Sequence, residues 1–193
     1  MPHSTLQIIR DEHASLNAIL KSILLMIERG PDDGPELFFD VMRAMLFYID
    51  EFPERHHHPK ESDLLFPRLV RAAPGLMSVV HRLEEDHIRG EARIRELQHL
   101  LLAWELIGDS RRQPFVDATK SYVGFYRDHM LCEETQLLPV AQKVLTDCDW
   151  AVLDAAFERD RDPLSTGNYQ PCYDRLFTRI VTRAPAPIGF GSA

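Results

Sequence analysis

The stretch His57-His58-Pro59-Lys60-Glu61 shares one spacing with the later stretch His129-Met130-Leu131-Cys132-Glu133. In each, three residues separate a histidine from a glutamate, and five more separate the glutamate from a proline, Pro67 or Pro139. Residues four apart on a helix lie one above the other on the same face. A histidine and a glutamate so placed can bind one metal ion, or the glutamate can bridge two. The repeated spacing therefore predicts two helices that direct an imidazole and a carboxylate at a common centre.

The sequence around these stretches has apolar residues at helical spacing. It predicts four long helices, at 6–28, from 36 to 69, at 76–106 and at 112–145. Pro53 and Pro59 interrupt the second helix, and we expect a bend there because proline removes an intrahelical donor. Short breaks rich in glycine, proline and aspartate join the helices, and no stretch predicts a strand. The predicted fold class is therefore all-α, an up-down-up-down four-helix bundle.

The chain continues past the fourth helix. We predict that residues 1–146 form the bundle and that residues 147–193 form a C-terminal extension packed on it. The extension is expected to contain a short helix at 149–160, capped by Thr146 or Asp147, and then a loop at 162–170. A last short helix is expected at 172–182, followed by an irregular tail. The apolar Ile188 and Phe190 of this tail would pack on the bundle or on a second copy, so a homodimer is one expectation.

Composition excludes several classes of function. The chain has 193 residues, of which 45% are apolar, and a net charge of −8 with histidine neutral. A nucleic acid or an anionic membrane would require a basic face, so neither is expected as a partner. No apolar run is long enough for a transmembrane helix, and the N-terminus lacks a secretory signal, so we predict a cytoplasmic protein. The three cysteines form no Cys-x-x-Cys pair and are expected to be reduced thiols.

Two further histidines belong with the repeated pair. His13 lies on the first helix among apolar residues, and His87 lies on the third, with Glu91 four residues after it. At about 1.5 Å rise per residue, His13, His57, His87 and His129 all fall roughly 10–24 Å from one end of the bundle. Imidazoles and carboxylates without thiolates suit iron or manganese and tolerate zinc. One buried metal site within the bundle is the resulting hypothesis.

Several residues keep a second interpretation. His13 by itself could be a hydrogen-bonded core histidine. Only one residue of His56-His57-His58 is expected to point inward, and the match with His129 favours His57, with His58 next. Tyr48, Tyr122 and Tyr126 could pack in the core or donate hydroxyl hydrogen bonds to ligand carboxylates. Gly90 could permit close helix approach or simply be tolerated.

The ordered set of residues resembles the hemerythrin-like (HHE cation-binding) family over roughly residues 6–145. The resemblance implies a pair of non-haem irons, one bound by His13 and His57 and the other by His87 and His129. It further implies that Glu61 and Glu133 bridge the irons, with an oxo or hydroxo group between them. An open position would accept a small ligand such as oxygen, peroxide or nitric oxide.

The chain departs from the oxygen-carrying members of that family. They have two histidines four apart on the third helix, whereas Leu83 and Glu91 flank His87 here. They also have His-x4-Asp on the fourth helix, where this chain has His-x3-Glu. If Glu91 replaces an imidazole, the added negative charge favours ferric iron. Iron or redox sensing, or chemistry on peroxide or nitric oxide, then becomes a better expectation than reversible oxygen carriage.

Three other functions compete with small-ligand binding. A non-catalytic sensor would use the metal to set the conformation of the C-terminal extension, and we expect a binding protein more than an enzyme. A ferritin-like di-iron oxidase would use Glu54-x-x-His57 and Glu84-x-x-His87, which leaves His13 and His129 unexplained. A zinc hydrolase is disfavoured because the chain has no His-Glu-x-x-His motif.

Overall fold

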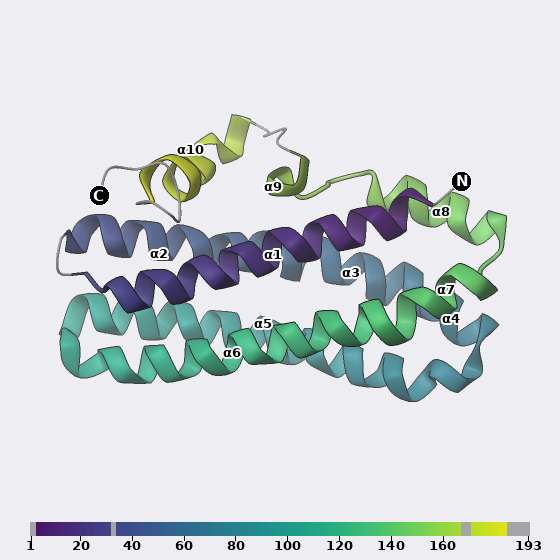
Figure 1. Ribbon diagram of the computed structural model, residues 1–193, viewed down its shortest axis with the longest axis horizontal. Helices are drawn as coiled ribbons and strands as arrows, with labels where there is room; N and C mark the ends of the chain where they lie inside the picture. The colour runs from purple at the N-terminus through teal and green to yellow at the C-terminus, as the bar shows by residue number, and fades with distance from the viewer. Residues whose placement is uncertain (1–2, 32–33, 167–170, 185–193) are drawn as a thin grey trace.

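The computed structural model describes residues 3–31, 34–166 and 171–184, and every regular element in these ranges is a helix. The predicted all-α class is therefore confirmed for them. Elements that follow one another without a break form four rods, which Figure 1 shows lying along one another. The first rod is α1 (Ser4–Arg29), and the second joins α2 (Pro35–Ile49), η1 (Asp50–His57), α3 (His58–Lys60), η2 (Glu61–Leu65) and α4 (Phe66–Ala72). The third is η3 (Pro74–Leu76) with α5 (Met77–Ile107), and the fourth joins η4 (Asp109–Arg111), α6 (Arg112–Cys132), η5 (Glu133–Leu137) and α7 (Leu138–Val144).

Each rod packs against two main neighbours. Both α1 and α5 contact α2 and α6, and Figure 1 shows the rods side by side along the long axis of the molecule. Two of the connections begin at glycines with positive φ, Gly30 at 74° and Gly108 at 101°. Each donates its N–H to a carbonyl four residues back, Met26 or Trp104, and so ends the helix.

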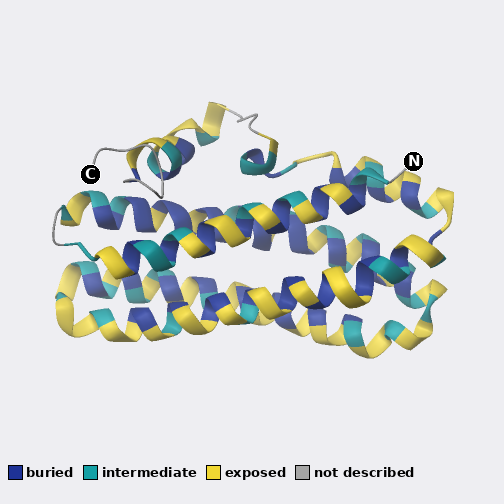
Figure 2. Ribbon diagram, in the orientation of Figure 1, coloured by how far each residue is buried: buried dark blue, intermediate teal, exposed yellow. Residues whose placement is uncertain are grey.

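The hydrophobic core has two clusters, and the residues predicted to bind metal lie where one gives way to the other. On α1, Ile9 belongs to one cluster and Leu16 to the other, with His13 between them. The other rods change cluster near His57, His87 and His129. Figure 2 shows buried residues along the inward side of every rod. The apolar clusters therefore enclose a polar layer at mid-bundle.

Both repeated stretches run into a π-helical turn. Phe66 N–H donates to the Glu61 carbonyl, and Leu138 N–H donates to the Glu133 carbonyl, so each bond spans five residues instead of four. The residue after each donor is a proline, which has no N–H to continue an α-helical ladder. The five-residue spacing from glutamate to proline thus coincides with a local widening of the helix just beyond each carboxylate.

The second rod stays helical at Pro53 and Pro59, but its α-helical hydrogen bonding is interrupted around Pro53; the expected bend stays a prediction. η1 is π-helical around Pro53, and His58 N–H donates to the Pro53 carbonyl. Pro59 lies in the first turn of α3, where a missing donor is tolerated. The backbone accommodates both prolines by changing its hydrogen-bond spacing.

The first element beyond the bundle is α8 (Asp147–Phe157), which packs on α1. Thr146, one of the two residues predicted to cap this helix, is its N-cap. Its hydroxyl accepts the Asp149 N–H at 3.2 Å. Asp154 Oδ1 accepts the Thr5 N–H at 2.9 Å and the Thr5 hydroxyl at 2.7 Å. Buried side chains of α8 join the cluster that contains Leu6 and Ile9; they are Trp150, Leu153 and Phe157.

The rest of the extension returns along the bundle. Residues 163–166 are not the predicted loop, because they form α9 (Pro163–Thr166), which packs on α1. Then η6 (Pro171–Tyr173), α10 (Asp174–Phe177) and η7 (Thr178–Arg183) follow, and η7 packs on α2. Residues 167–170 of the predicted loop and the tail with Ile188 and Phe190 lie outside the described residues.

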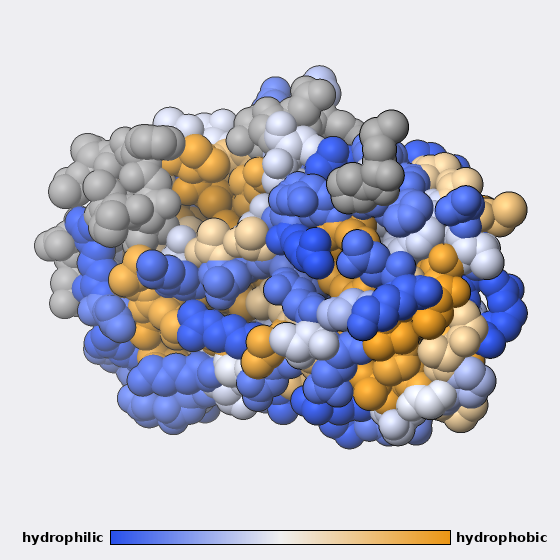
Figure 3. Space-filling model, turned by 45° about the vertical axis from the view of Figure 1, so that its right-hand side comes forward, coloured by the Kyte–Doolittle hydropathy of each residue, from blue (hydrophilic) through white to orange (hydrophobic). Residues whose placement is uncertain are grey.

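The face seen in Figure 3 is mainly hydrophilic, with smaller hydrophobic patches between the charged side chains. Among the described residues, no helix combines the length and the apolar character needed to cross a membrane.

Truncation of Leu153 tests whether α8 is part of the cooperative fold. Leu153 is fully buried in the cluster shared with α1. We expect Leu153→Ala to lower the free energy of unfolding of the whole protein by about 2–4 kcal/mol, because it leaves a cavity in that cluster. Urea denaturation followed by circular dichroism measures the change.

The adjacent residue provides the control. Val152 is 45% exposed, so Val152→Ala should change the free energy of unfolding by less than about 0.5 kcal/mol. Equal, small effects of both substitutions would mean that α8 unfolds separately from the bundle.

Candidate metal centre

Six of the seven side chains predicted to bind metal meet in the polar layer. His13 comes from α1, His57 and Glu61 from the second rod, His87 from α5, and His129 and Glu133 from the fourth rod. Their ligand atoms form two groups in which all atoms lie within 4.8 Å of one another. One group is His13, His57 and Glu61, and the other is Glu61, His87, His129 and Glu133. Glu61 belongs to both groups.

The cluster has two halves, one with His13 and His57 and the other with His87 and His129. Each glutamate directs one of its oxygens at each half. Glu61 Oε1 lies 3.3 Å from His57 Nε2, while Glu61 Oε2 lies 3.6 Å from His87 Nε2. Glu133 Oε2 lies 3.2 Å from His13 Nε2, while Glu133 Oε1 lies 3.3 Å from His129 Nε2. Two carboxylates in this position could each connect two ions.

The site fits cations because its polar atoms are otherwise unsatisfied. Among the described residues, both oxygens of Glu61 and of Glu133 are buried without a hydrogen-bond partner, as are Nε2 of His57, His87 and His129. Both glutamate side chains are fully buried. A buried carboxylate without a positive partner costs several kcal/mol, and a metal ion removes that cost.

A hydrogen-bonding group holds the other ring nitrogen of three of the four histidines, His13, His57 and His87. Nδ1 of His13 lies 2.9 Å from Glu134 Oε1, and Nδ1 of His57 lies 2.6 Å from Glu12 Oε2. Nδ1 of His87 lies 2.9 Å from Ser62 Oγ. Asp86 Oδ2 is 3.7 Å from Nδ1 of His129, which is within ion-pair distance but too long for a hydrogen bond. The hydrogen-bonded rings are fixed with Nε2 directed into the cluster, where it could bind a metal ion, and such partners are the usual neighbours of histidine ligands.

Buried charge shifts the pKa values within the cluster. Burial opposes ionisation of Glu133, but His129 and His13 outweigh it and hold the pKa of Glu133 well below its ordinary value. Burial would lower the pKa of His129, yet Glu133 and Asp86 raise it to about 10. Burial and repulsion from Glu133 raise the pKa of Glu61. A metal ion that binds Nε2 of His129 would displace the proton that Glu133 and Asp86 hold on this ring, so metal binding would release protons.

Glu91 does not join the cluster, which corrects the prediction that it replaces an imidazole. Its side chain is about half exposed and pairs with Arg95 one turn along α5. Glu91 therefore lies on the solvent side of the helix that carries His87. Glu91 therefore adds no negative charge to the site, and the argument that it favours ferric iron no longer applies.

His58 is the residue that the sequence undervalued. His57 and His58 are both buried, so the expectation that one residue of the three points inward is wrong. The His56 ring lies beside Phe52, outside the cluster. Burial, together with the nearby His129, holds the pKa of His58 well below its ordinary value.

The sequence-based assignment also missed the carboxylates that orient the histidines. Glu12 and Glu134 each adjoin a predicted ligand in sequence, as does Asp86. That adjacency was the available signal, but it does not reveal the pairing: Glu12 precedes His13 and yet binds His57.

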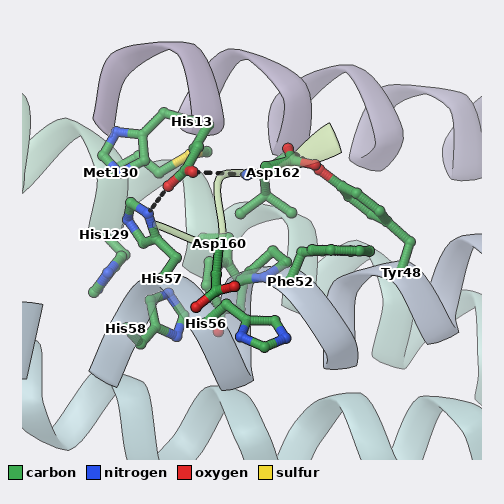
Figure 4. Close-up of a pocket in the computed structure, with 14 residues that line it drawn as sticks. His13, Tyr48, Phe52, His56, His57, His58, His129, Met130, Asp160 and Asp162 are labelled. Atoms are coloured by element: carbon green, nitrogen blue, oxygen red, sulfur yellow. Dashed lines mark hydrogen bonds and ion pairs between the residues drawn. The ribbon is translucent and has the colours of Figure 1, made fainter. Parts of the chain in front are cut away.

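A small cavity lies beside the cluster, with room of about 20 Å³ for the centre of a water-sized molecule. Its walls include His13, His57 and His58 from the bundle, and Asp160 and Asp162 from the segment between α8 and α9 (Figure 4). A space of this size accommodates about one water or a molecule of similar size. The C-terminal extension thus closes one side of the space next to the candidate metal site.

These features define the class of protein: a helical bundle whose buried histidines and glutamates could hold metal ions. Residues 4–141 match the family Hemerythrin, described as the hemerythrin HHE cation binding domain. The match covers most of the chain, so the protein belongs to this family, as the resemblance predicted. A comparison with curated proteins found no match.

A pH series tests the buried contact of the extension with the bundle. Burial raises the pKa of Asp162 from 3.8 to about 6, despite the hydrogen bond from Tyr48 at 2.5 Å. A folded-state pKa above the unfolded value means that stability is fully present below about pH 4 and is lost as pH rises through about 6. Relative to Asp162→Asn, the wild type should lose up to about 2–3 kcal/mol across that interval.

Urea unfolding of both proteins at a series of pH values measures this difference. Above about pH 7 the difference should be constant, because Asp162 is then ionised in both states. Parallel pH profiles for the two proteins would show that Asp162 does not titrate abnormally.

Proposed function

We propose that this protein holds two non-haem irons in an up-down-up-down four-helix bundle and binds, or reacts with, a small ligand such as oxygen, peroxide or nitric oxide. The observation that carries the proposal is the placement of Glu61 and Glu133, each fully buried with its two oxygens directed at different histidines. Imidazole and carboxylate donors without thiolate favour iron or manganese, and zinc is tolerated.

The chain's own residues determine what the site can accept. Two irons would supply an open position and electrons for a small ligand. His13 and His57 line the adjoining cavity, whose size restricts a ligand to about one water or a diatomic molecule. Apolar clusters on both sides of the polar layer keep bulk water out. The charges of Glu61 and Glu133 would balance part of the charge of the metal pair.

An iron titration compares substitutions of Glu91, which lies outside the cluster, and Glu133, which lies within it. We expect the wild type and Glu91→Gln to bind two irons per chain, because Glu91 lies outside the cluster. Glu133→Gln should weaken binding by at least about 100-fold, because it removes an anionic group that faces both halves of the site. Anaerobic titration with ferrous iron and analysis of bound metal measure both.

Peroxide or nitric oxide added to the iron-loaded wild type then separates binding from turnover. Stoichiometric optical changes support a binding protein, and catalytic consumption supports an enzyme. Well-folded protein that takes up no transition metal would end the proposal, as would wild-type iron binding by Glu133→Gln.

A sensor is the second candidate function, and one contact favours it. Glu12 Oε2 holds the ring of His57, while Glu12 Oε1 accepts the backbone N–H of Asp162 at 3.0 Å. One carboxylate therefore connects a proposed metal ligand with the C-terminal extension. Lys60, one residue before Glu61, also donates to the carbonyls of Arg159 and Asp160. A movement of His57 on metal binding would be felt at this segment.

Hydrogen exchange with and without iron tests the sensor. If Glu12 transmits the change, iron should slow amide exchange at 159–166 in the wild type by about tenfold or more, because each 1.4 kcal/mol of added local stability is worth that factor. In Glu12→Gln the amide end cannot accept as two oxygens do, and the effect of iron should shrink. An equal effect of iron in both proteins would exclude Glu12 as the connection.

The ferritin-like arrangement is not supported. Glu84 is exposed, and Glu54 faces Tyr122, Tyr126 and His58.

A further inference from the structure

His58 lies against the second half of the cluster. It is 4% exposed. Its ring stacks on that of His87, with centroids 4.1 Å apart and planes 11° apart, and its centroid lies 5.6 Å from that of His129. Because an imidazole binds a metal in its ring plane, one of the two stacked rings must turn for both to bind the same ion. Ligand atoms of His58, His87 and His129 all lie within 4.8 Å of one another. This is the scale of a single coordination sphere.

The ring of His58 is held in the same way as those of the predicted ligands. Nδ1 lies 3.0 Å from Glu54 Oε2, one helical turn earlier. Glu54 Oε1 in turn accepts hydrogen bonds from the hydroxyls of Tyr126 and Tyr122. A carboxylate on Nδ1 leaves Nε2 as the nitrogen that can bind a metal, as Glu12 does for His57.

On the third rod, Gly90 leaves space for the side chains of Tyr126 and Glu54, which hold the His58 ring. A Cβ atom at that position would lie 2.0 Å from the Tyr126 hydroxyl oxygen and 3.0 Å from Glu54 Oε1. Any larger residue would displace the tyrosine that holds Glu54. Of the two interpretations of Gly90, close approach is therefore the one that the structure supports, and it serves the His58 side of the cluster.

The π-helical backbone explains how neighbouring residues both reach the interior. η1 ends at His57, and His58 N–H donates to a carbonyl five residues back. A π turn holds more residues than an α turn, so successive side chains are separated by a smaller angle. His57 thus faces the half of the site with His13, while His58 faces the half with His87.

We propose that His58 is the third imidazole ligand of the metal ion held by His87 and His129. The proposal rests on the proposed metal pair and assigns a residue to it. It restores, from the second rod, the imidazole that Leu83 and Glu91 fail to supply on the third. The ion on this side would have three imidazoles and the ion at His13 and His57 two, with both carboxylates shared. The site then carries less negative charge than a Glu91 ligand would give it.

The test compares four variants of the 193-residue chain, each loaded with ferrous iron. His58→Ala should weaken binding of one of the two irons by at least about 100-fold, since it removes a direct ligand, and added imidazole should restore part of the affinity. His56→Ala, the neighbouring control, should bind both irons as the wild type does. Competition with a chelator measures affinity, and Mössbauer spectra of the loaded proteins resolve the two iron environments.

Glu54→Gln keeps the size of the side chain and covers the case in which His58→Ala fails to fold. It should weaken the same iron by about tenfold, because it loosens the partner of the ligand. In the Mössbauer spectrum, His58→Ala and Glu54→Gln should alter the same iron environment, and His13→Ala should alter the other.

The outcomes separate this inference from the proposed function. If the wild type binds no metal pair, both fail. If it binds two irons and His58→Ala leaves both affinities and both spectra unchanged, His58 is not a ligand, although the metal pair stands. If His58→Ala is unfolded, unchanged iron binding by Glu54→Gln overturns the inference.

Discussion

The structure depends on the burial of two carboxylates, Glu61 and Glu133, at the centre of a helical bundle. Neither is exposed, and each faces histidines on both sides. Negative charge in such a place must be balanced by protons or by metal ions. The raised pKa of His129 shows the first solution, since burial alone would lower it and Glu133 overcomes that effect. Metal ions are the second, and the unpaired ligand atoms suit them better.

The apolar framework concentrates these groups in one layer. On each rod, residues of one hydrophobic cluster precede the layer and residues of the other follow it. The framework supplies the packing energy, and the polar layer can then be assembled from groups that would not remain buried by themselves. Ordinary α-helix covers most of each rod, and π turns occur at the carboxylates, where helix geometry decides which side chains meet.

The C-terminal extension belongs to the same physical system. Glu12 divides its two oxygens between the His57 ring and the backbone of Asp162, and Asp160 and Asp162 line the cavity beside the cluster. The extension therefore closes the small-ligand space and touches the support of one histidine. This double contact is what makes both small-ligand binding and sensing reasonable functions for one site.

The sequence by itself determined the helical class, the approximate helix limits and six of the side chains that meet. These follow from periodicities of 3.6 and four residues, which are local properties of a helix. It failed at His58 and Glu91 because helical spacing alone does not show whether a side chain faces the bundle interior or the solvent. Packing between helices decides this. Glu91 follows His87 by four residues, yet α5 turns it to solvent, where Arg95 binds it. The sequence favoured His57 over His58 as the residue that points inward, but the π-helical turn places both side chains in the interior.

Only the tertiary structure decided which carboxylate supports which histidine. Glu12 adjoins His13 in sequence but binds His57, and Glu54 is held by tyrosines from α6 that Gly90 of α5 leaves room for. Asp162 reaches the site from the extension. Such partners come from different rods, and spacing along one helix carries no information about the distance to another. The local chemistry could therefore be predicted from the sequence, while the connections between helices required the folded arrangement.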